Sequence, residues 1–341
     1  MSKKRNIVVI GTSKMAQLHM EGVTKAACLY GICDNAPEQL AAAHALFPDA
    51  KTCADYRDFV NDPQVDAAVI VTPDYYHLEM TAAFLRAGKD VLCEKPMALT
   101  QEECEEMMAV ERETGRKLMI GQICRCTPGF VAAHDLVARG AIGDLFFVES
   151  EYAHNYDHAK GYNNWRVDPR RHAFIGGGCH AVDLLRWIAG DPEEVFAYSN
   201  HKCLTDWPVD DCTVALLRFP NGVSGKVFAS IGCKRNYTMR SVFYGTKGTI
   251  ICDNTSDHIT LFEDNPAEGK SDYTQGQIIP VDVNNHNAAA EIEAFIRALN
   301  ADDPMPIGSY EGAATVAVCC AAMESSRTGA PVRVRYPRKN A

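Results

Sequence analysis

The stretch NIVVIGTSKMA, residues 6–16, decides the fold of this 341-residue chain. Its first half is a short apolar run that predicts a buried strand. Its second half is a degenerate form of the GxGxxG turn, which joins a strand to a helix in dinucleotide-binding folds. Gly11 takes the first glycine position and Ala16 the third, but Ser13 replaces the second glycine, which normally lets the backbone approach a pyrophosphate. The Ser13 side chain crowds that approach, although its hydroxyl can donate to a phosphate.

An acidic residue at the end of the second apolar run supports a dinucleotide site. Asp34 follows Leu29–Cys33, about 20 residues after the turn, where a carboxylate accepts hydrogen bonds from ribose hydroxyls. A carboxylate here repels the 2′-phosphate of NADP, and the neighbouring Asn35 is neutral, so we expect NAD as the cofactor. Asp34 could also be the N-cap of a helix that begins at Ala36, and the two roles can coexist.

The first third of the chain alternates short apolar runs with helical patterns. Thr100 and Glu103 form the pattern of a capping box at the start of one predicted helix, Thr100–Thr114. All-apolar strands separated by helices indicate a parallel sheet covered on both faces, so we predict an α/β Rossmann domain that binds NAD over residues 1–122. Its other predicted elements are the strands Ala67–Val71, Val91–Cys93 and Leu118–Ile120 and the helices Ala36–Leu46 and His77–Ala87.

The pattern changes after about residue 122. Longer and partly alternating segments appear, and the turn pairs Asn221-Gly222 and Lys247-Gly248 predict antiparallel hairpins. We therefore predict an α+β domain with a large, mostly antiparallel sheet over residues 123–341. Its expected strands are Phe146–Ala153, Cys212–Phe219, Val223–Ile231, Met239–Tyr244, Thr249–Cys252 and Ile259–Phe262, and its helices are His180–Ala189, Asn287–Leu299 and Glu311–Arg327.

Composition excludes several classes of partner. The net charge is -10 and no basic cluster is longer than Lys3–Arg5, which argues against nucleic acid. No apolar run approaches the ~20 residues that span a bilayer, so we expect no membrane insertion. The N-terminal apolar run IVVI is too short for a secretion signal, and we expect a cytoplasmic protein.

The fourteen cysteines are scattered and include no CxxC pair. Cys33, Cys93 and Cys252 lie in apolar segments, where cysteine behaves as a small hydrophobic residue. We therefore predict structural thiols rather than disulfides or a zinc site.

Two strand ends carry the remaining cofactor candidates. The run Val91–Cys93 is followed by Glu94-Lys95-Pro96, and the strand before it is followed by Thr72-Pro73 and then His77. Ligands bind at the carboxyl edge of an open α/β sheet, so these side chains point to the cofactor crevice. A lysine beside the positive nicotinamide ring loses its proton more readily and can exchange it with a hydroxyl. His77 either starts the next helix or contacts the cofactor.

These segments resemble the glucose–fructose oxidoreductase, inositol dehydrogenase and MocA (Gfo/Idh/MocA) family. The resemblance implies that Lys95 lies near the nicotinamide, that Lys95–Pro96 can be a cis peptide, and that the second sheet covers the site and often forms the interface of a homodimer or homotetramer. The matching segments are GTSKMAQLH, ICD, VIVTPDYYH, AGKDVLCEKPMALT, IGQICRCTPGF, GAIGDLFFVE, GGGCHAVDLLRWIAG and YGTKGTI. The predicted cofactor residues are Gly11, Thr12, Ser13, Lys14, Met15, Asp34, Thr72, Pro73, His77, Glu94 and Lys95.

A histidine and an aspartate after three glycines complete the resemblance. His180 and Asp183 are three residues apart and share one face of a helix. An isolated pair of this kind is often structural, but after EKP the resemblance implies that His180 exchanges the substrate proton with Lys95. Asp183 would bind a hydroxyl or orient His180. Gly176 departs from the pattern, because many polyol dehydrogenases of the family carry aspartate there.

A polar and aromatic segment lies between the two motifs. Residues 152–172 are rich in tyrosine, histidine, asparagine and arginine, which suits a polyhydroxylated ligand but also a polar surface loop. His154, Asp157 and His158 could be taken for metal ligands, but nothing else supports a metal and we predict none. By the resemblance Arg125 borders the active site, and the alternative is an ordinary interdomain ion pair. The predicted substrate residues are Arg125, Tyr156, Trp165, Arg166, His180 and Asp183.

The motifs together predict an NAD-dependent dehydrogenase of EC 1.1.1 type. The expected reaction oxidises a secondary ring hydroxyl, at C3, of a sugar, glycoside or cyclitol, with Lys95 and His180 as proton acceptors and Asp183 as the third catalytic residue. An alternative is redox-neutral cleavage or epimerisation of a glycoside through a transient 3-keto sugar, with NAD tightly bound. A third reading, a regulatory relative without chemistry, is favoured only by Ser13 and Gly176.

Overall fold

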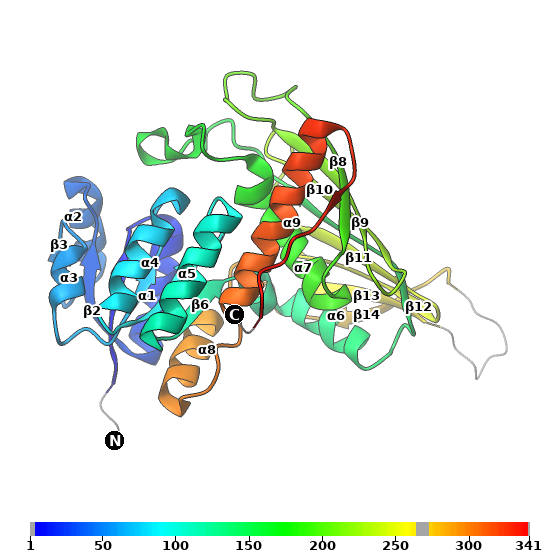
Figure 1. Ribbon diagram of the computed structural model, residues 1–341. Coiled ribbons are helices and arrows are strands. Elements are labelled where there is room, and N and C mark those ends of the chain that lie inside the picture. Colours follow the sequence, from blue (N-terminus) through cyan, green and yellow to red (C-terminus); the bar gives the residue numbers. More distant parts are fainter. Residues whose placement is uncertain (1–3, 264–272, 340–341) are drawn as a thin grey trace. The chain divides into compact units, whose positions relative to one another are not determined.

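The computed structural model describes residues 4–263 and 273–339, so Lys3 of the basic N-terminal run lies outside the described residues. The chain forms two compact units (Figure 1). Unit 1 contains the chain up to Gln122, the segment Asn287–Ala313 and a C-terminal segment that begins at Pro337. Unit 2 contains Ile123–His286 and Ala314–Tyr336.

This division differs from the two contiguous domains predicted at 1–122 and 123–341. The helix α8 (Ala288–Ala301) belongs to unit 1 because its apolar side chains join the core of the first sheet. Ile292 and Phe295 lie in one buried cluster with Ile7, and Gly22 of α1 (Lys14–Ala26) leaves room for the backbone of α8. Sequence order does not reveal this return of the chain to the first core.

Unit 1 is built on a parallel sheet in the strand order β3-β2-β1-β4-β5-β6 among the described residues, as predicted for a Rossmann domain. The register aligns four strand ends, because Ile10 pairs with both Cys33 and Ile70, and Ile70 pairs with Cys93. The residues that follow these four positions therefore share the carboxyl edge of the sheet. The strands are β1 (Asn6–Ile10), β2 (Cys28–Cys33), β3 (Lys51–Cys53), β4 (Ala67–Ile70), β5 (Asp90–Glu94) and β6 (Leu118–Gly121).

The helices of unit 1 include one whose start was predicted from a capping box and one that was not predicted. Thr100 and Glu103 form both hydrogen bonds of the predicted capping box at the start of α5 (Gln101–Thr114). The helix α3 (Arg57–Asn61) was not predicted, and Gly31 of β2 makes room for its Phe59, because a Cβ at Gly31 would lie 2.2 Å from the phenylalanine ring. The other helices are α2 (Pro37–Leu46), the short 3₁₀ helix η1 (Asp74–Tyr76) and α4 (His77–Arg86).

Unit 2 is built on a second sheet in the order β14-β13-β12-β11-β7-β10-β9-β8-β15 among the described residues. The neighbours β7 and β10 are parallel and the other pairs are antiparallel, as predicted for a mostly antiparallel sheet. The strands are β7 (Leu145–Ala153), β8 (Glu194–Asn200), β9 (Cys212–Arg218), β10 (Ser224–Ser230), β11 (Arg240–Gly245), β12 (Gly248–Asp253), β13 (His258–Glu263), β14 (Gln277–Pro280) and β15 (Val332–Arg333). The strands β8, β14 and β15 were not predicted.

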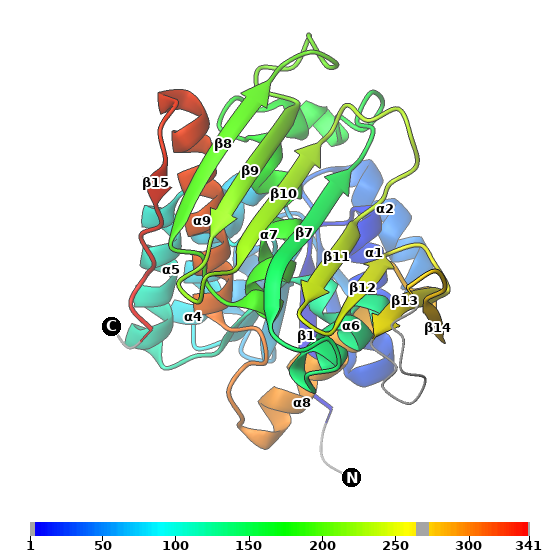
Figure 2. The same cartoon turned by 90° about the vertical axis from the view of Figure 1, so that its right-hand side faces the viewer.

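Helices cover one face of this second sheet. The helices α6 (Pro128–Ala138) and α7 (Cys179–Ala189) pack on it, and Figure 2 shows the opposite face without helices. The remaining elements are the 3₁₀ helices η2 (Ile123–Cys126) and η3 (Tyr162–Val167), the π-helical turn η4 (Phe174–Gly178), and α9 (Ser309–Thr328), most of which lies in unit 2. No helix among the described residues is long and apolar enough to cross a membrane.

The cysteines are free thiols in the described part of the chain, in agreement with the predicted structural role. Cys33, Cys93 and Cys252 are buried, and burial raises the pKa of the Cys252 thiol well above its ordinary value.

Candidate active site

The glycine turn after β1 has the shape that a dinucleotide needs. Gly11 has φ +102°, and a Cβ there would lie 2.4 Å from the carbonyl oxygen of Val71, so glycine alone fits. Ser13 is the N-cap of α1, and its hydroxyl oxygen accepts from the backbone N–H of Ala16 at 3.2 Å. That contact leaves the hydroxyl proton available to a phosphate. The turn and the helix start fit a pyrophosphate, in spite of the missing second glycine.

Asp34 lies beside this turn at the end of β2. Its Oδ2 accepts from the Thr12 hydroxyl at 2.6 Å, and its Oδ1 accepts from the N–H of Ala36 at 2.9 Å. The helix α2 begins at Pro37 with Ala36 as its N-cap, so Asp34 does not cap it. Each carboxylate oxygen has a further lone pair, which leaves acceptors for ribose hydroxyls.

His77 has a different environment from the predicted cofactor contact. Its side chain is buried, with Nδ1 2.8 Å from the Pro96 carbonyl oxygen and Nε2 3.1 Å from that of Thr72. Both ring nitrogens are therefore occupied by the protein. Burial alone would lower the pKa of His77, but Cys93, Asp74 and the Pro96 carbonyl raise it to about 9. A protonated ring can donate to both carbonyls and so joins two loops of the sheet edge, and we revise its predicted role to a structural one.

Lys95 follows β5 at the carboxyl edge of the parallel sheet, and its side chain is half-buried. The Lys95–Pro96 peptide bond is cis, as the family resemblance implied. Glu94 points inward and is 6% exposed, with Oε2 accepting from the Lys95 N–H at 3.0 Å. The prediction that Glu94 binds the cofactor does not fit this inward direction, and its contacts are those of a support for Lys95.

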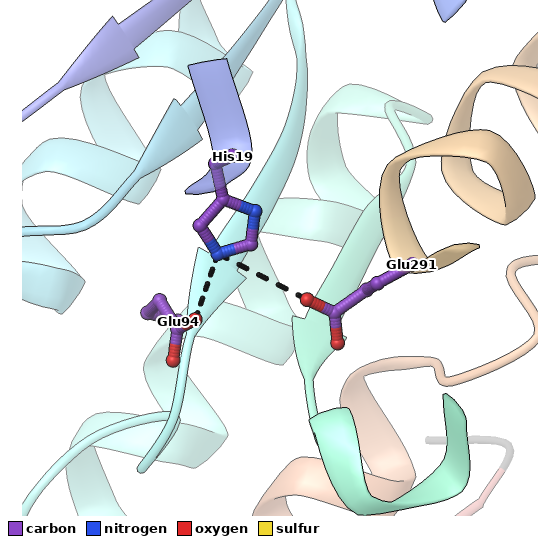
Figure 3. Close-up of side chains that lie close together, drawn as sticks. All are labelled: His19, Glu94 and Glu291. Atoms are coloured by element: carbon purple, nitrogen blue, oxygen red, sulfur yellow. Dashed lines mark hydrogen bonds and ion pairs between the residues drawn. The ribbon is translucent and has the colours of Figure 1, made fainter. Parts of the chain in front are cut away.

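Glu94 belongs to a buried cluster that the sequence did not reveal (Figure 3). His19 Nε2 lies 2.8 Å from Glu94 Oε1 and 4.0 Å from Glu291 Oε2. His19 and Glu291 are completely buried. Potential metal-binding atoms of the three residues lie within 4.8 Å of one another, the one such group among residues 4–263 and 273–339. A possible signal was Glu291 itself, a charged residue on the apolar face of α8.

The three glycines before α7 allow two side chains of unit 2 to approach the backbone. A Cβ at Gly177 would lie 2.4 Å from the ring of Tyr152, and a Cβ at Gly176 would lie 2.8 Å from Nη2 of Arg171. The position at which family members carry aspartate is therefore covered by a guanidinium group. The glycines are needed for close packing, and they pass directly into the helix that carries His180.

His180 lies among aromatic side chains, which we call the aromatic cluster. Its ring stacks on Tyr152 at 5.9 Å between centroids and 18° between planes, and its Nδ1 is 3.5 Å from Cys124 Sγ. The Tyr152 hydroxyl is 2.8 Å from that of Tyr156. The aromatic cluster consists of Tyr152, His154, Tyr156, Tyr237 and His286, connected by ring contacts of 4.5–5.9 Å. The sequence did not show that Tyr237 and His286 join this group.

The described contacts of Asp183 are with Arg125 and Thr315, and its predicted role toward a substrate hydroxyl or His180 stays a prediction. Its side chain is completely buried and accepts two hydrogen bonds from Arg125, each 2.8 Å, and one from the Thr315 hydroxyl at 3.0 Å. These contacts hold the carboxylate away from solvent. The ion pair lies within unit 2, so it is not the interdomain pair considered for Arg125. The contacts of Arg125 and Asp183 support α7, and substrate binding by either residue stays a prediction.

Two other predicted substrate residues contact each other. The Arg166 guanidinium lies 4.5 Å from the centre of the Trp165 ring and 5.7 Å from that of Tyr156, and Arg171 lies 4.4 Å from the Trp165 ring. Trp165 therefore supports two arginines and is not an open platform for a sugar ring. Arg166, Tyr156 and Trp207 line a small pocket of unit 2 beside Gly176 and Gly177.

Asp157 and His154, which could be taken for metal ligands, contact other side chains of the protein. Asp157 forms an ion pair with Lys234, and His154 contacts the Tyr152 hydroxyl at 3.2 Å and stacks on Tyr237. The described contacts of His154 and Asp157 belong to different networks.

Comparisons with known proteins agree with these features. Residues 5–122 match the family described as "Oxidoreductase family, NAD-binding Rossmann fold", and residues 130–251 match the "GFO/IDH/MocA C-terminal domain". The chain is 33% identical over 218 residues to a trans-1,2-dihydrobenzene-1,2-diol dehydrogenase of Oryctolagus cuniculus, which covers 62% of each chain. It is 27% identical to inositol 2-dehydrogenase 2 of Saccharopolyspora erythraea over 96% of each chain.

Solved structures share the fold at low sequence identity. A levoglucosan dehydrogenase in complex with NADH has a TM-score of 0.87 and 21% identity, and the match covers 98% of this chain and 100% of that one. An oxidoreductase domain protein from Kribbella flavida has a TM-score of 0.88 and 23% identity over 98% of this chain and 100% of that one.

The turn, Asp34 and the matched Rossmann model define an oxidoreductase that uses NAD. Both of its sheets match models of one family. The chain belongs to the Gfo/Idh/MocA oxidoreductase family.

Proposed function

We propose that this protein oxidises a secondary ring hydroxyl, at C3, of a sugar, glycoside or cyclitol, and that Lys95 and His180 accept the hydroxyl proton. The observation that carries the proposal is the aromatic cluster around His180. Sugars present hydroxyl edges and apolar C–H faces, and tyrosine and histidine rings offer both hydrogen bonds and flat apolar surface. The relatives named inositol 2-dehydrogenase and levoglucosan dehydrogenase are named for polyhydroxylated rings and support this substrate class.

The groups on either side of His180 are compatible with the proposed C3 position. A C3 hydroxyl of a pyranose has a hydroxyl neighbour on each side. Tyr152 stacks on the His180 ring, and His286 approaches the same ring edge-on at 6.5 Å. Tyr152 and His286 therefore lie beside the His180 ring on two sides. Their polar atoms suit a substrate whose reacting hydroxyl has a hydroxyl group on each side.

In the proposed reaction the hydroxyl proton goes to side chains of the protein, and the hydride on the carbinol carbon goes to the nicotinamide. NAD, when bound, supplies the two-electron oxidant. Asp34, Thr12 and the turn at Gly11 hold the dinucleotide in the proposal, and Lys95 with His180 removes the hydroxyl proton. Burial, followed by the neighbouring Tyr156, raises the pKa of Tyr152 well above its ordinary value, and burial does the same for Tyr237. Both phenols stay protonated and can donate to substrate oxygens.

The test is a screen of sugars, glycosides and cyclitols by NADH absorbance, followed by single substitutions. Lys95→Ala and His180→Ala should abolish NADH formation while calorimetry shows NAD affinity close to that of the unchanged protein. The exposed Lys25 gives the control, because Lys25→Ala should leave both quantities unchanged. Turnover retained by Lys95→Ala would disprove the assignment.

The redox-neutral alternative uses the same first step. The aromatic cluster favours this alternative, because it contains more titratable side chains than the transfer of one proton requires. The high pKa values of Tyr152 and Tyr237 leave His154 and His286 as the candidates for an added base. Incubation of pyranosides without added NAD distinguishes the two reactions, since cleaved or epimerised product without accumulated NADH supports the alternative.

A further inference from the structure

The cluster of His19, Glu94 and Glu291 has no place in the chemistry proposed so far, yet it contacts the backbone of Lys95. Its members come from α1, β5 and α8 of unit 1, and Figure 3 shows the imidazole between the two carboxyl groups. The exposed fractions are 0% for His19 and Glu291 and 6% for Glu94. Buried ionisable groups without partners are costly, so the charges here have to be balanced within the cluster.

Glu291 balances its charge by keeping its proton. Neither of its carboxyl oxygens has a hydrogen-bond partner among the described residues, and His19 Nε2 lies 4.0 Å from Glu291 Oε2. An ionised carboxylate in this position would be buried without a hydrogen bond. Burial, together with the charge of Glu94, raises the pKa of Glu291 well above its ordinary value. Burial, the missing hydrogen bonds and this direction of the pKa shift all favour the protonated form of Glu291.

Glu94 carries the negative charge of the cluster. His19 Nε2 donates to Glu94, whereas Nδ1 is buried without a hydrogen-bond partner in the described structure. Burial opposes the ionisation of Glu94, but His19, through its hydrogen bond and electrostatically, and Lys95, through its charge and its amide N–H, hold the pKa of Glu94 below the ordinary value.

We propose that His19 and Glu291 are positioning residues that hold the Glu94 carboxylate, which in turn fixes the backbone of Lys95. The hydrogen bond from His19 joins α1, the helix that starts at the glycine turn, to the strand end that carries Lys95. Glu291 fills the third side as a neutral group, so Glu94 remains the one anion. The inference rests on the proposed role of Lys95, since a displacement of about 1 Å in a catalytic group can lower the rate by about 100-fold.

A bound divalent cation is the competing account of the same three side chains. A metal would require Nε2 of His19 without its proton and both carboxylates ionised. The 2.8 Å separation of His19 Nε2 from Glu94 Oε1 is that of an N–H···O hydrogen bond, and the Lys95 N–H occupies the other oxygen of Glu94. Hydrogen bonds therefore explain the contacts of both Glu94 oxygens without a metal ion.

The first experiment examines the proton of Glu291 directly. Glu291→Gln keeps the volume and the neutrality of the side chain, so the variant should fold with a Tm close to that of the unchanged protein. The infrared difference spectrum between the two proteins at pH 7 should show the C=O band of a protonated carboxylic acid lost in the variant. Absence of that band, or a stoichiometric metal that survives dialysis and is lost in Glu291→Gln, would overturn the proposal.

The second experiment separates positioning from mere stability. His19→Leu removes the donor to Glu94, whereas His19→Gln retains an amide N–H at a similar reach. We expect kcat to fall about 10- to 100-fold in His19→Leu, with NAD affinity little changed, and to recover largely in His19→Gln. A lower Tm in both variants with unchanged kcat of the folded protein would show a structural role only and contradict the inference.

The two hypotheses fail separately. If Lys95→Ala keeps its turnover, the proposed function is wrong, but the infrared band of Glu291 remains. If Lys95→Ala is inactive and His19→Leu keeps full kcat, the positioning role alone is wrong. Should His19→Leu fail to fold, His19→Gln and the infrared measurement still decide the matter.

Discussion

Arg125 donates two parallel hydrogen bonds to Asp183, from Nε to Oδ2 and from Nη2 to Oδ1, each 2.8 Å long. The pair joins η2 to α7, and the same two segments bring Cys124 Sγ within 3.5 Å of His180 Nδ1. His180 thus faces the aromatic cluster, whereas Asp183, three residues later, holds α7 in place. Residues three apart lie on the same side of a helix, so His180 and Asp183 can contact the neighbouring residues Cys124 and Arg125.

The buried pair should be strongly coupled in stability. Arg125→Met leaves the Asp183 carboxylate buried without its main partner, and we expect the free energy of unfolding to fall by about 3–5 kcal/mol. The double variant Arg125→Met/Asp183→Leu removes both charges and should recover much of the loss. Denaturant unfolding measures both. The exposed pair Arg57 and Glu79 is the control, with an expected effect of about 0–1 kcal/mol for Arg57→Ala. Additive losses in the double variant would contradict the coupling.

Gly177 should be needed for activity because of the ring that covers it. The Cβ of Gly177→Ala would lie 2.4 Å from Tyr152, which stacks on His180, so the substitution displaces a ring of the aromatic cluster. We expect kcat to fall by about 10-fold or more, since small displacements of reacting groups are costly. Gly222→Ala is the matched control, because its φ of +86° makes alanine strained while no atom lies within 4 Å. Equal kcat in the two variants would refute this interpretation.

Asp34 should set the affinity for NAD. Asp34→Asn keeps an acceptor for the Ala36 N–H but removes the charge that strengthens hydrogen bonds to ribose hydroxyls. Hydrogen bonds to charged groups contribute about 1.5–3 kcal/mol, so we expect NAD to bind about 10- to 100-fold more weakly. The preference for NAD over NADP should narrow, because the repulsion of a 2′-phosphate disappears. Calorimetry with both cofactors tests this, and Thr12→Val controls for the loss of the neighbouring hydroxyl.

His77 should make stability depend on pH in the alkaline range. Its pKa is about 9 in the folded chain against an ordinary value of 6.5, so the folded state binds the proton more tightly. The resulting stabilisation is complete below about pH 6.5 and is lost as the pH rises through about 9, with a size of about 3 kcal/mol. Denaturant unfolding at several pH values should show this fall, and His77→Gln should flatten it. An equal slope in the variant would assign the fall to other groups.

The helix-free face of the second sheet is our candidate for the homodimer or homotetramer interface. Leu216 of β9 is 52% exposed and pairs across the strands with Phe196, and Tyr198 of β8 is 68% exposed. Leu216→Lys places a charge in this apolar region and should convert an oligomer to smaller species in light scattering. Leu46→Lys, at an exposed leucine of α2, is the control. An unchanged oligomer in Leu216→Lys would exclude this face.

The parts of the fold that could be predicted are those fixed by local chemistry. Gly11 ends β1 because only glycine adopts its φ, and Thr100 with Glu103 starts α5 through two local hydrogen bonds. The strand β3 was missed because three residues, Lys51–Cys53, carry no apolar pattern. Its pairing with β2 makes it a strand, and pairing partners are distant in the sequence.

The candidate site was predicted unevenly for the same reason. His180 and Lys95 could be named from motifs, but the burial of Asp183 depends on Arg125 and Thr315, which lie 58 and 132 residues away. A sequence motif identifies residue types that a reaction needs. It does not show that the carboxylate oxygens of Asp183 already accept hydrogen bonds from Arg125 and Thr315.

The sequence by itself determined the Rossmann turn, the NAD cofactor and the family, since each depends on short runs whose order along the chain is sufficient. Only the tertiary structure showed the contacts of Glu94, His77 and Asp183, because these contacts depend on partners brought together by packing. The contact of His19 with Glu94 and Glu291 joins three separate elements of unit 1. A buried charge takes its protonation state from such neighbours, and the linear sequence does not list them.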